Sequence, residues 1–265
     1  MTDPRPIGIF DSGVGGLTVL SEVEKVLPKE EIIYFGDTAR VPYGAKSRET
    51  VTKFSVENVE FLMKHDVKIV LVACNTASSL SLDFLKRCFR VPIIGVIDPG
   101  ARSAVNITRT SRIGVIGTNA TIASGAYEKA VRKISSRITV YSQKCPLFVP
   151  LAEEGWTNNN VACDIASIYL KPLKKKNIDT LILGCTHYPL LKDAIKSVMG
   201  RMVHLVDSAE AVAKEARDLL DASGILNQRA GKKKHKFFVS DQPDNFIKIG
   251  ERFLKRKMDG VSKII

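Results

Sequence analysis

Short β-branched segments alternate with longer amphipathic segments along the whole 265-residue chain. This alternation predicts an α/β fold with mostly parallel sheets, because parallel strands need a long, usually helical, crossover between them. We expect strands at residues 7–10, 32–35, 69–73, 93–96, 113–116, 139–141, 180–183, 203–206 and 237–239. We expect helices at residues 17–26, 48–64, 78–87, 101–107, 123–133, 161–174, 190–198, 209–222 and 245–255.

Two pairs of segments recur along the chain at nearly equal offsets. The segment Gly8-Ile9-Phe10-Asp11 has a counterpart in Gly114-Val115-Ile116-Gly117, and the strand that ends at Cys74 has a counterpart in the strand that ends at Cys185. The repeat predicts two pseudo-symmetric α/β domains, each with its own central sheet flanked by helices. We expect residues 1–98 and 208–265 to form the first domain and residues 99–207 the second, with the active site in the cleft between them.

The composition is that of a globular protein, with 45% hydrophobic and 26% charged residues. No apolar run approaches the roughly 20 residues that a membrane span requires. The first residues contain no apolar core of a signal peptide. We therefore expect a cytoplasmic protein that does not contact the membrane.

Five cysteines and four histidines are too widely spaced for a disulfide framework or a zinc site, and no C-x-x-C motif occurs. No metal site is expected. We interpret Cys88, Cys145 and Cys163 as structural, since free cysteines are commonly small buried hydrophobic residues.

The formal net charge is +12, and the densest basic cluster lies at residues 232–236. A basic protein attracts anions, so nucleic-acid or protein binding as a second role is one hypothesis. A solvated loop is the other interpretation of the cluster. No nucleic-acid-binding motif accompanies the charge, and we do not expect nucleic acid as a partner.

The two strand-end cysteines are each followed by polar residues that suit a helix start. Cys74 precedes Asn75 and Thr76, and Cys185 precedes Thr186 and His187. The N-terminus of a helix favours a thiolate and binds carboxylates. His187 is close enough in sequence to influence the Cys185 thiol. The alternative is that each cysteine is a buried residue closing a strand.

A glycine-rich turn at residues 11–16 follows the first expected strand. Its spacing is neither the dinucleotide-binding pattern nor a P-loop. A tight turn accounts for the glycines but not for Asp11, which is suited to hold an ammonium group or to influence a thiol. Tyr43 and Gly44 belong to a further loop that either supplies donors to a carboxylate or forms a plain turn.

Five motifs in this order resemble the glutamate racemases of the cofactor-independent aspartate/glutamate racemase family. They lie at residues 8–16, 37–44, 73–77, 149–155 and 183–189, and the resemblance covers nearly the whole chain. It implies an isomerase that interconverts L- and D-glutamate without a cofactor, supplying D-glutamate to peptidoglycan and hence to the cell wall and cell shape. It also implies a homodimer.

The resemblance also assigns residues to roles. It implies that Cys74 and Cys185 are the acid–base pair, that Asp11, His187 and Glu153 assist them, and that Glu154, beside Glu153, is the alternative acid. The implied substrate contacts are Asp11, Ser12, Tyr43, Gly44, Asn75, Thr76, Thr186 and His187.

The residues support the same chemistry, because racemisation needs one thiolate and one thiol on opposite faces of the α-carbon. Fixed hydrogen-bond donors would stabilise the charge that develops on the substrate carboxylate. A racemase acting on aspartate and a one-thiol lyase or isomerase acting on an α-carboxylate are the alternatives.

Overall fold

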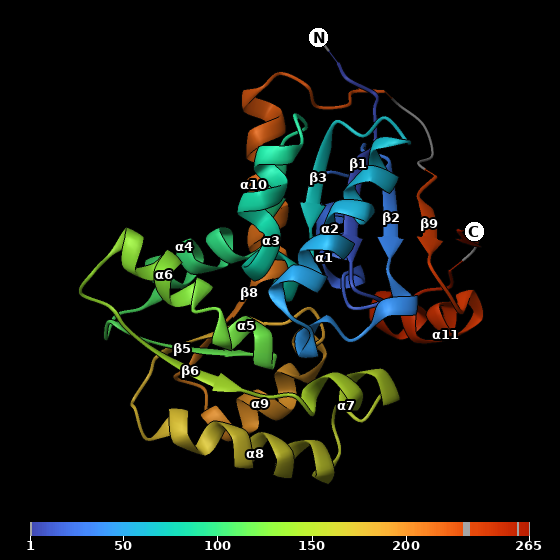
Figure 1. Cartoon of the computed structure of the whole chain (residues 1–265). Helices are drawn as coiled ribbons and strands as arrows, with labels where there is room; N and C mark the ends of the chain where they lie inside the picture. Colours follow the sequence, from blue (N-terminus) through green and yellow to red (C-terminus); the bar gives the residue numbers. More distant parts are fainter. Residues whose placement is uncertain (1, 230–233, 259, 265) are drawn as a thin grey trace.

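The computed structural model describes residues 2–229, 234–258 and 260–264 and contains two sheets, each flanked by helices (Figure 1). All strand pairs within the two sheets are parallel. The predicted α/β fold with two mostly parallel sheets is therefore confirmed.

The first sheet has six strands in the order β10-β9-β2-β1-β3-β4, so strands from the two ends of the chain lie side by side. Strand β9 pairs with β2 and carries the last segment of the chain back to the first sheet. The bounds are β1 Ile7–Asp11, β2 Ile32–Gly36, β3 Ile69–Val72, β4 Ile93–Gly95, β9 Lys236–Val239 and β10 Val261–Lys263.

The second sheet has four strands in the order β6-β5-β7-β8. This order matches the β2-β1-β3-β4 part of the first sheet, strand for strand, so β5 corresponds to β1 and β7 to β3. The predicted repeat is therefore a repeat of topology. The bounds are β5 Arg112–Gly117, β6 Thr139–Lys144, β7 Thr180–Gly184 and β8 His204–Asp207.

Helices cover both faces of each sheet. The α-helices are α1 Leu17–Val26, α2 Arg48–Met63, α3 Asn75–Cys88, α4 Ile97–Ile107, α5 Asn119–Ala123, α6 Ala126–Ile134, α7 Phe148–Glu154, α8 Asn160–Lys174, α9 Lys192–Met199, α10 Ser208–Ala222 and α11 Pro243–Leu254. Single turns of 3-10 helix occur at η1 Thr38–Arg40, η2 Tyr43–Ala45 and η3 Tyr188–Leu191.

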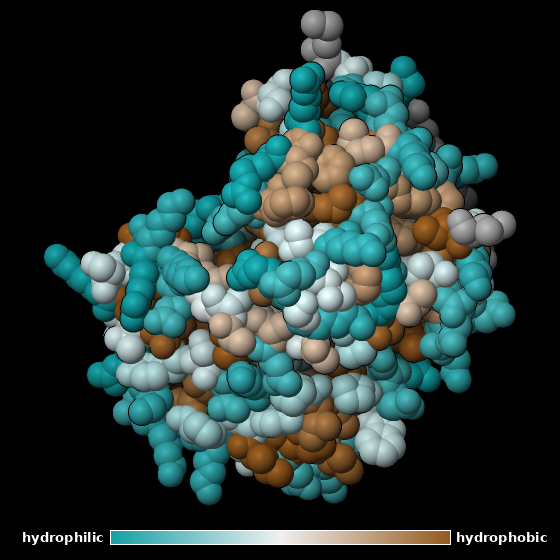
Figure 2. Space-filling model, viewed as in Figure 1, coloured by the Kyte–Doolittle hydropathy of each residue, from teal (hydrophilic) through white to brown (hydrophobic). Residues whose placement is uncertain are grey.

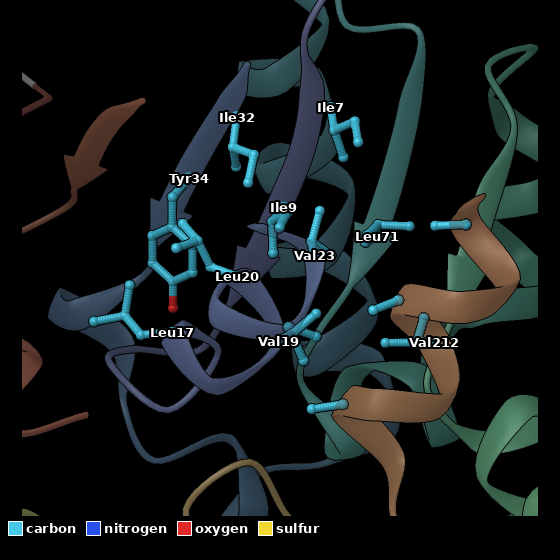
Figure 3. Packing of buried hydrophobic residues seen from close by; sticks show 14 of the residues in the cluster. Ile7, Ile9, Leu17, Val19, Leu20, Val23, Ile32, Tyr34, Leu71 and Val212 are labelled. Atoms are coloured by element: carbon cyan, nitrogen blue, oxygen red, sulfur yellow. The ribbon is translucent and has the colours of Figure 1, made fainter. Parts of the chain in front are cut away.

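The core of the first sheet follows from the alternation of side chains along its strands. Ile7 and Ile9 of β1 pack on one side with α1 and α10, whereas Phe10 packs on the opposite side with α2 and α3. Figure 3 shows Ile9 facing the side chains of α1, with Val212 of α10 alongside. Burial of these side chains fixes β1 in the centre of the sheet and thereby fixes the position of its carboxyl end.

Several boundaries differ from the sequence-based predictions. Strand β10 and helix α7 were not predicted, and the helix expected at 123–133 is divided at Gly125, whose φ of 64° is left-handed. The segment around Asp98 and Pro99, where the boundary between the domains is expected, lies in the first turn of α4. A proline in the first turn removes no helical hydrogen bond, so it does not stop the helix. The division into 1–98 plus 208–265 and 99–207 stays a prediction.

Within the described residues, no helix has the length and apolar character needed to cross a bilayer. Hydrophobic side chains gather over the region of α8 at one edge of the molecule (Figure 2). Ile168 of α8 is 71% exposed, and Trp156 just before this helix is 51% exposed.

Candidate active site

A pocket of about 350 Å³ opens where the carboxyl ends of the two sheets meet. Ligands in parallel α/β sheets bind beyond the carboxyl ends of the strands, so this is the expected place for a site. The predicted site residues that line it are Ser12, Tyr43, Gly44, Cys74, Asn75, Thr76, Glu153, Cys185, Thr186 and His187. Both strand-end cysteines therefore open into one cavity.

Cys74 is the N-cap residue of α3 and follows directly after β3 and Ala73. Its sulfur accepts a hydrogen bond from the backbone N–H of Ala77 at 3.5 Å and lies 3.7 Å from Oγ of Ser12. These contacts hold the thiol at the N-terminus of α3, the position that the sequence predicted. The helix begins at Asn75, three residues before its predicted start at 78.

The ionisation of Cys74 differs from the sequence-based expectation, which was that the helix N-terminus lowers the pKa of the thiol. Burial and, after it, the negative charge of Asp11 raise the pKa of Cys74 to about 12, against a smaller opposing effect of the Ala77 N–H. The expectation of a lowered pKa is therefore wrong for Cys74. Desolvation outweighs the helix end here because a thiolate is poorly accommodated in a buried position.

Asp11 ends β1, is completely buried and does not line the pocket. Its Oδ2 accepts a hydrogen bond from the Gly13 N–H at 3.0 Å, while Oδ1 makes no hydrogen bond to any described residue. Burial raises the pKa of Asp11, against the opposing positive charge of His187. Asp11 is thus a buried carboxyl group that acts electrostatically on Cys74 and on His187.

Cys185 is buried after β7 and has a histidine within reach. Nδ1 of His187 lies 3.8 Å from Sγ of Cys185, and Nε2 of the same ring lies 2.9 Å from Oε1 of Glu153. Burial alone would lower the pKa of His187, but the interactions with Cys185 and Glu153 outweigh it and raise this pKa to about 10. A protonated imidazole at neutral pH is therefore placed beside the Cys185 sulfur.

The structure distinguishes the two neighbouring acids of α7. Glu153 lines the pocket and contacts His187, whereas Glu154 is exposed and lies outside the pocket. The Arg252 side chain donates a hydrogen bond to the Glu153 carbonyl oxygen at 2.8 Å, which ties α7 to α11. These contacts favour Glu153 as the site acid.

Polar groups from both halves of the molecule, each half being one sheet with the helices that cover it, complete the pocket. The hydroxyl groups of Thr76 and Thr118 lie 3.0 Å apart, and those of Thr76 and Thr121 lie 3.2 Å apart. Tyr43 is buried, and its hydroxyl group is hydrogen-bonded to Asp37 and, at 3.1 Å, to the Asn58 amide. The loop that carries Tyr43 and Gly44 is therefore held rigidly at the edge of the pocket.

Sequence reasoning missed several lining residues. Thr118 and Asn119 follow β5, in the same position as the glycine-rich turn after β1, and the repeat was the signal that could have found them. An apolar wall of the pocket was also missed, although the motifs at 37–44 and 149–155 contain most of it; it comprises Val41, Pro42, Pro146, Val149 and Pro150.

The three remaining cysteines do not line the pocket. Cys145 is buried, Cys163 is half-buried and Cys88 is exposed, and all are free thiols. No cluster of three or more metal-binding side chains occurs in the part of the chain that the structure describes. Of the basic cluster, Lys232 and Lys233 lie outside the described residues, and Lys234 is exposed.

Comparison with known proteins gives a consistent result. The family model described as Asp/Glu/hydantoin racemase matches residues 12–216. A glutamate racemase from Geobacter metallireducens is 53% identical over 260 residues, covering 98% of this chain and 96% of that protein.

Solved structures agree over the whole fold. A glutamate racemase from Bacillus anthracis superimposes with a TM-score of 0.95 at 43% identity, covering 98% of this chain and 97% of that one. A glutamate racemase from Francisella tularensis, solved in complex with D-glutamate, superimposes with a TM-score of 0.93 at 40% identity. That match covers 99% of this chain and 98% of the other.

Proposed function

The chain belongs to the Asp/Glu/hydantoin racemase family, and on this basis we propose that it is a glutamate racemase, an isomerase that interconverts L- and D-glutamate. One observation carries the proposal: two thiols, Cys74 and Cys185, line the same pocket and follow equivalent strands of the two sheets. Equivalent positions in two facing halves would place one sulfur on each face of a bound α-carbon. Each enantiomer would then meet a base on one side and an acid on the other.

The surroundings of the two thiols differ before substrate arrives. Cys74, with its pKa raised to about 12 by burial and by Asp11, is a thiol at neutral pH. Cys185 has the protonated His187 beside its sulfur. With Cys185 as the thiolate, Cys185 would remove the α-proton and the Cys74 thiol would return one. The family resemblance assigns that direction to L-glutamate, and the reverse state to D-glutamate.

The polar lining of the pocket is suited to a dicarboxylic amino acid. The Asn75 amide and the hydroxyl groups of Ser12, Thr76 and Thr186 are donors near the thiols. They would bind the α-carboxylate and stabilise the charge that grows on it as the α-proton leaves. The loop that carries Tyr43 and Gly44 would receive the side-chain carboxylate, as the resemblance implies.

Both proton-transfer groups belong to the chain, so the proposed reaction uses no added cofactor. The test is incubation of the exhaustively dialysed protein with each enantiomer of glutamate in D2O. We expect deuterium at the α-carbon of the product from either direction. Activity that is lost on dialysis and restored by pyridoxal phosphate would contradict the cofactor-free reaction. Turnover of aspartate in place of glutamate would contradict the assignment of glutamate as the substrate.

We further propose a cytoplasmic homodimer that supplies D-glutamate for peptidoglycan synthesis. Five free thiols suit a reducing compartment. The exposed side chains of Val161 and Ile168 are seven residues apart on α8 and therefore lie on one face of this helix. Exposed apolar patches are typical of interaction surfaces. Sedimentation of the wild-type protein and of Ile168→Glu tests this. If the wild-type protein sediments as a dimer and Ile168→Glu as a monomer, the result supports this face of α8 as the dimer interface. A wild-type protein that sediments as a monomer excludes the dimer.

A further inference from the structure

A hydrogen bond joins the two halves of the molecule beside the pocket. The hydroxyl group of Tyr127, on α6, donates to Oδ1 of Asn75, the first residue of α3, at 2.7 Å. Tyr127 packs with the side chains that cover the second sheet, whereas α3 covers the first sheet. Both partners are buried, at 3% and 2% exposure.

The direction of this bond fixes the orientation of the Asn75 amide. Oδ1 accepts from Tyr127, so the two N–H groups on Nδ2 are left for another partner. Nδ2 is buried and has no hydrogen-bond partner among the described residues, although Asn75 lines the pocket. An unpaired buried donor costs free energy that a bound acceptor would recover.

The position of Tyr127 is itself held by its neighbours. The Ser208 hydroxyl interacts with the Tyr127 hydroxyl and opposes the rise in the pKa of Tyr127 that burial causes. A β-carbon on Gly100 would lie 3.3 Å from Cβ of Ser208 and 3.4 Å from the Tyr127 ring, so the glycine permits this packing.

We propose that Tyr127 is a positioning residue that holds the Asn75 amide with its N–H groups directed into the pocket, toward the substrate carboxylate. The proposal rests on the proposed function for the identity of that carboxylate. Tyr127 itself does not line the pocket, so it acts through Asn75. Because the two residues belong to different halves, the amide is set correctly only when the halves are packed as they are here.

The first test is the substitution Tyr127→Phe, which keeps the ring and removes the hydroxyl group. One neutral hydrogen bond corresponds to a loss of up to about tenfold in kcat/KM. Tyr169→Phe is the matched control, since the Tyr169 hydroxyl accepts a hydrogen bond from the Leu147 N–H at 3.4 Å and lies outside the pocket. We expect this control to retain wild-type kcat/KM. Wild-type kcat/KM in Tyr127→Phe would overturn the proposal.

A double-mutant cycle separates positioning from general destabilisation. If Tyr127 acts through Asn75, then Tyr127→Phe causes no further loss in an Asn75→Ala background. A merely structural role predicts that the two losses multiply, and that result would overturn the proposal.

A spectroscopic measurement makes the test independent of catalysis. The side-chain N–H resonances of Asn75 are assigned by their loss in Asn75→Asp, and we expect them to shift in Tyr127→Phe but not in Tyr169→Phe. Unchanged resonances in Tyr127→Phe would overturn the proposal. If the wild-type protein does not racemise glutamate, the proposed function fails, and these resonances still decide the role of Tyr127.

Discussion

Sγ of Cys185 and Nδ1 of His187 lie 3.8 Å apart, and the imidazole is held from its other side by Glu153. The other thiol, Cys74, has the buried Asp11 carboxyl group near it instead. One sulfur therefore has a cation beside it and the other an acid. The topology of the two halves is nearly symmetric, but the electrostatics of the two thiols is not, and the predictions below depend on that difference.

Cys74→Ala and Cys185→Ala should each abolish racemisation in both directions, because a missing acid is as harmful as a missing base. We expect losses of at least about 10²-fold, the lower end for a single acid–base group. The double variant should be no worse than either single one, as for groups that act together. Circular dichroism of each glutamate enantiomer measures both directions. Cys163→Ala, outside the pocket, is the control that should retain activity. More than about one hundredth of wild-type activity in either single variant would support a one-thiol reaction instead.

Asp11→Asn should lower the pKa of Cys74, because the negative charge of Asp11 is the second cause of its elevation after burial. The alkaline limb of kcat/KM should move to lower pH in the direction that needs Cys74 as a thiol. We expect turnover to fall by about 10²-fold, with thermal melting near that of the wild-type protein. Parallel losses of stability and activity would show that Asp11 is only a core residue.

His187→Asn should remove a pH-dependent contribution to stability. The pKa of His187 is raised from 6.5 to about 10 in the folded protein, because the contacts with Cys185 and Glu153 outweigh burial. Its stabilising effect is then complete below pH 6.5 and is lost as pH rises through about 10. Urea unfolding of both proteins between pH 6 and about 10 should show the difference in unfolding free energy shrinking with pH. A difference in unfolding free energy that grows with pH over this range would contradict the prediction.

Glu153→Gln should reduce turnover by about tenfold or more, since it removes the charge that holds His187 protonated. Glu154→Gln is a matched control, because the adjacent carboxylate is exposed and lies outside the pocket. We expect this control to have wild-type kinetics. Steady-state assays of the two variants compare the acids directly, and a larger effect at Glu154 would reverse the assignment.

The repeat in the sequence was enough to predict the topology of the site. Matching β1 with β5 and β3 with β7 predicted that Cys74 and Cys185 lie at equivalent strand ends, and the sheet orders agree. The pattern worked because side-chain alternation and strand-end cysteines are local features. Their roles in catalysis stay predictions.

What sequence could not supply depends on contacts between distant segments. Helix α7 was missed because Pro150 indicates a loop, yet it lies in the first helical turn, where proline is tolerated. The pKa of Cys74 was misjudged because the helix start is visible in the sequence, whereas burial and the proximity of Asp11 arise only on folding. The pairing of Tyr127 with Asn75 likewise crosses between the two halves and leaves no local pattern.

The return of β9 and β10 to the first sheet has a consequence for folding during synthesis. The second sheet is complete once residue 207 has left the ribosome, but the edge of β2 is not covered until β9 has followed, at residues 236–239. An uncovered strand edge is a site for pairing with other chains. The nascent protein therefore carries an open sheet edge until β9 has been synthesised. The first sheet, whose synthesis begins first, is therefore completed after the second sheet.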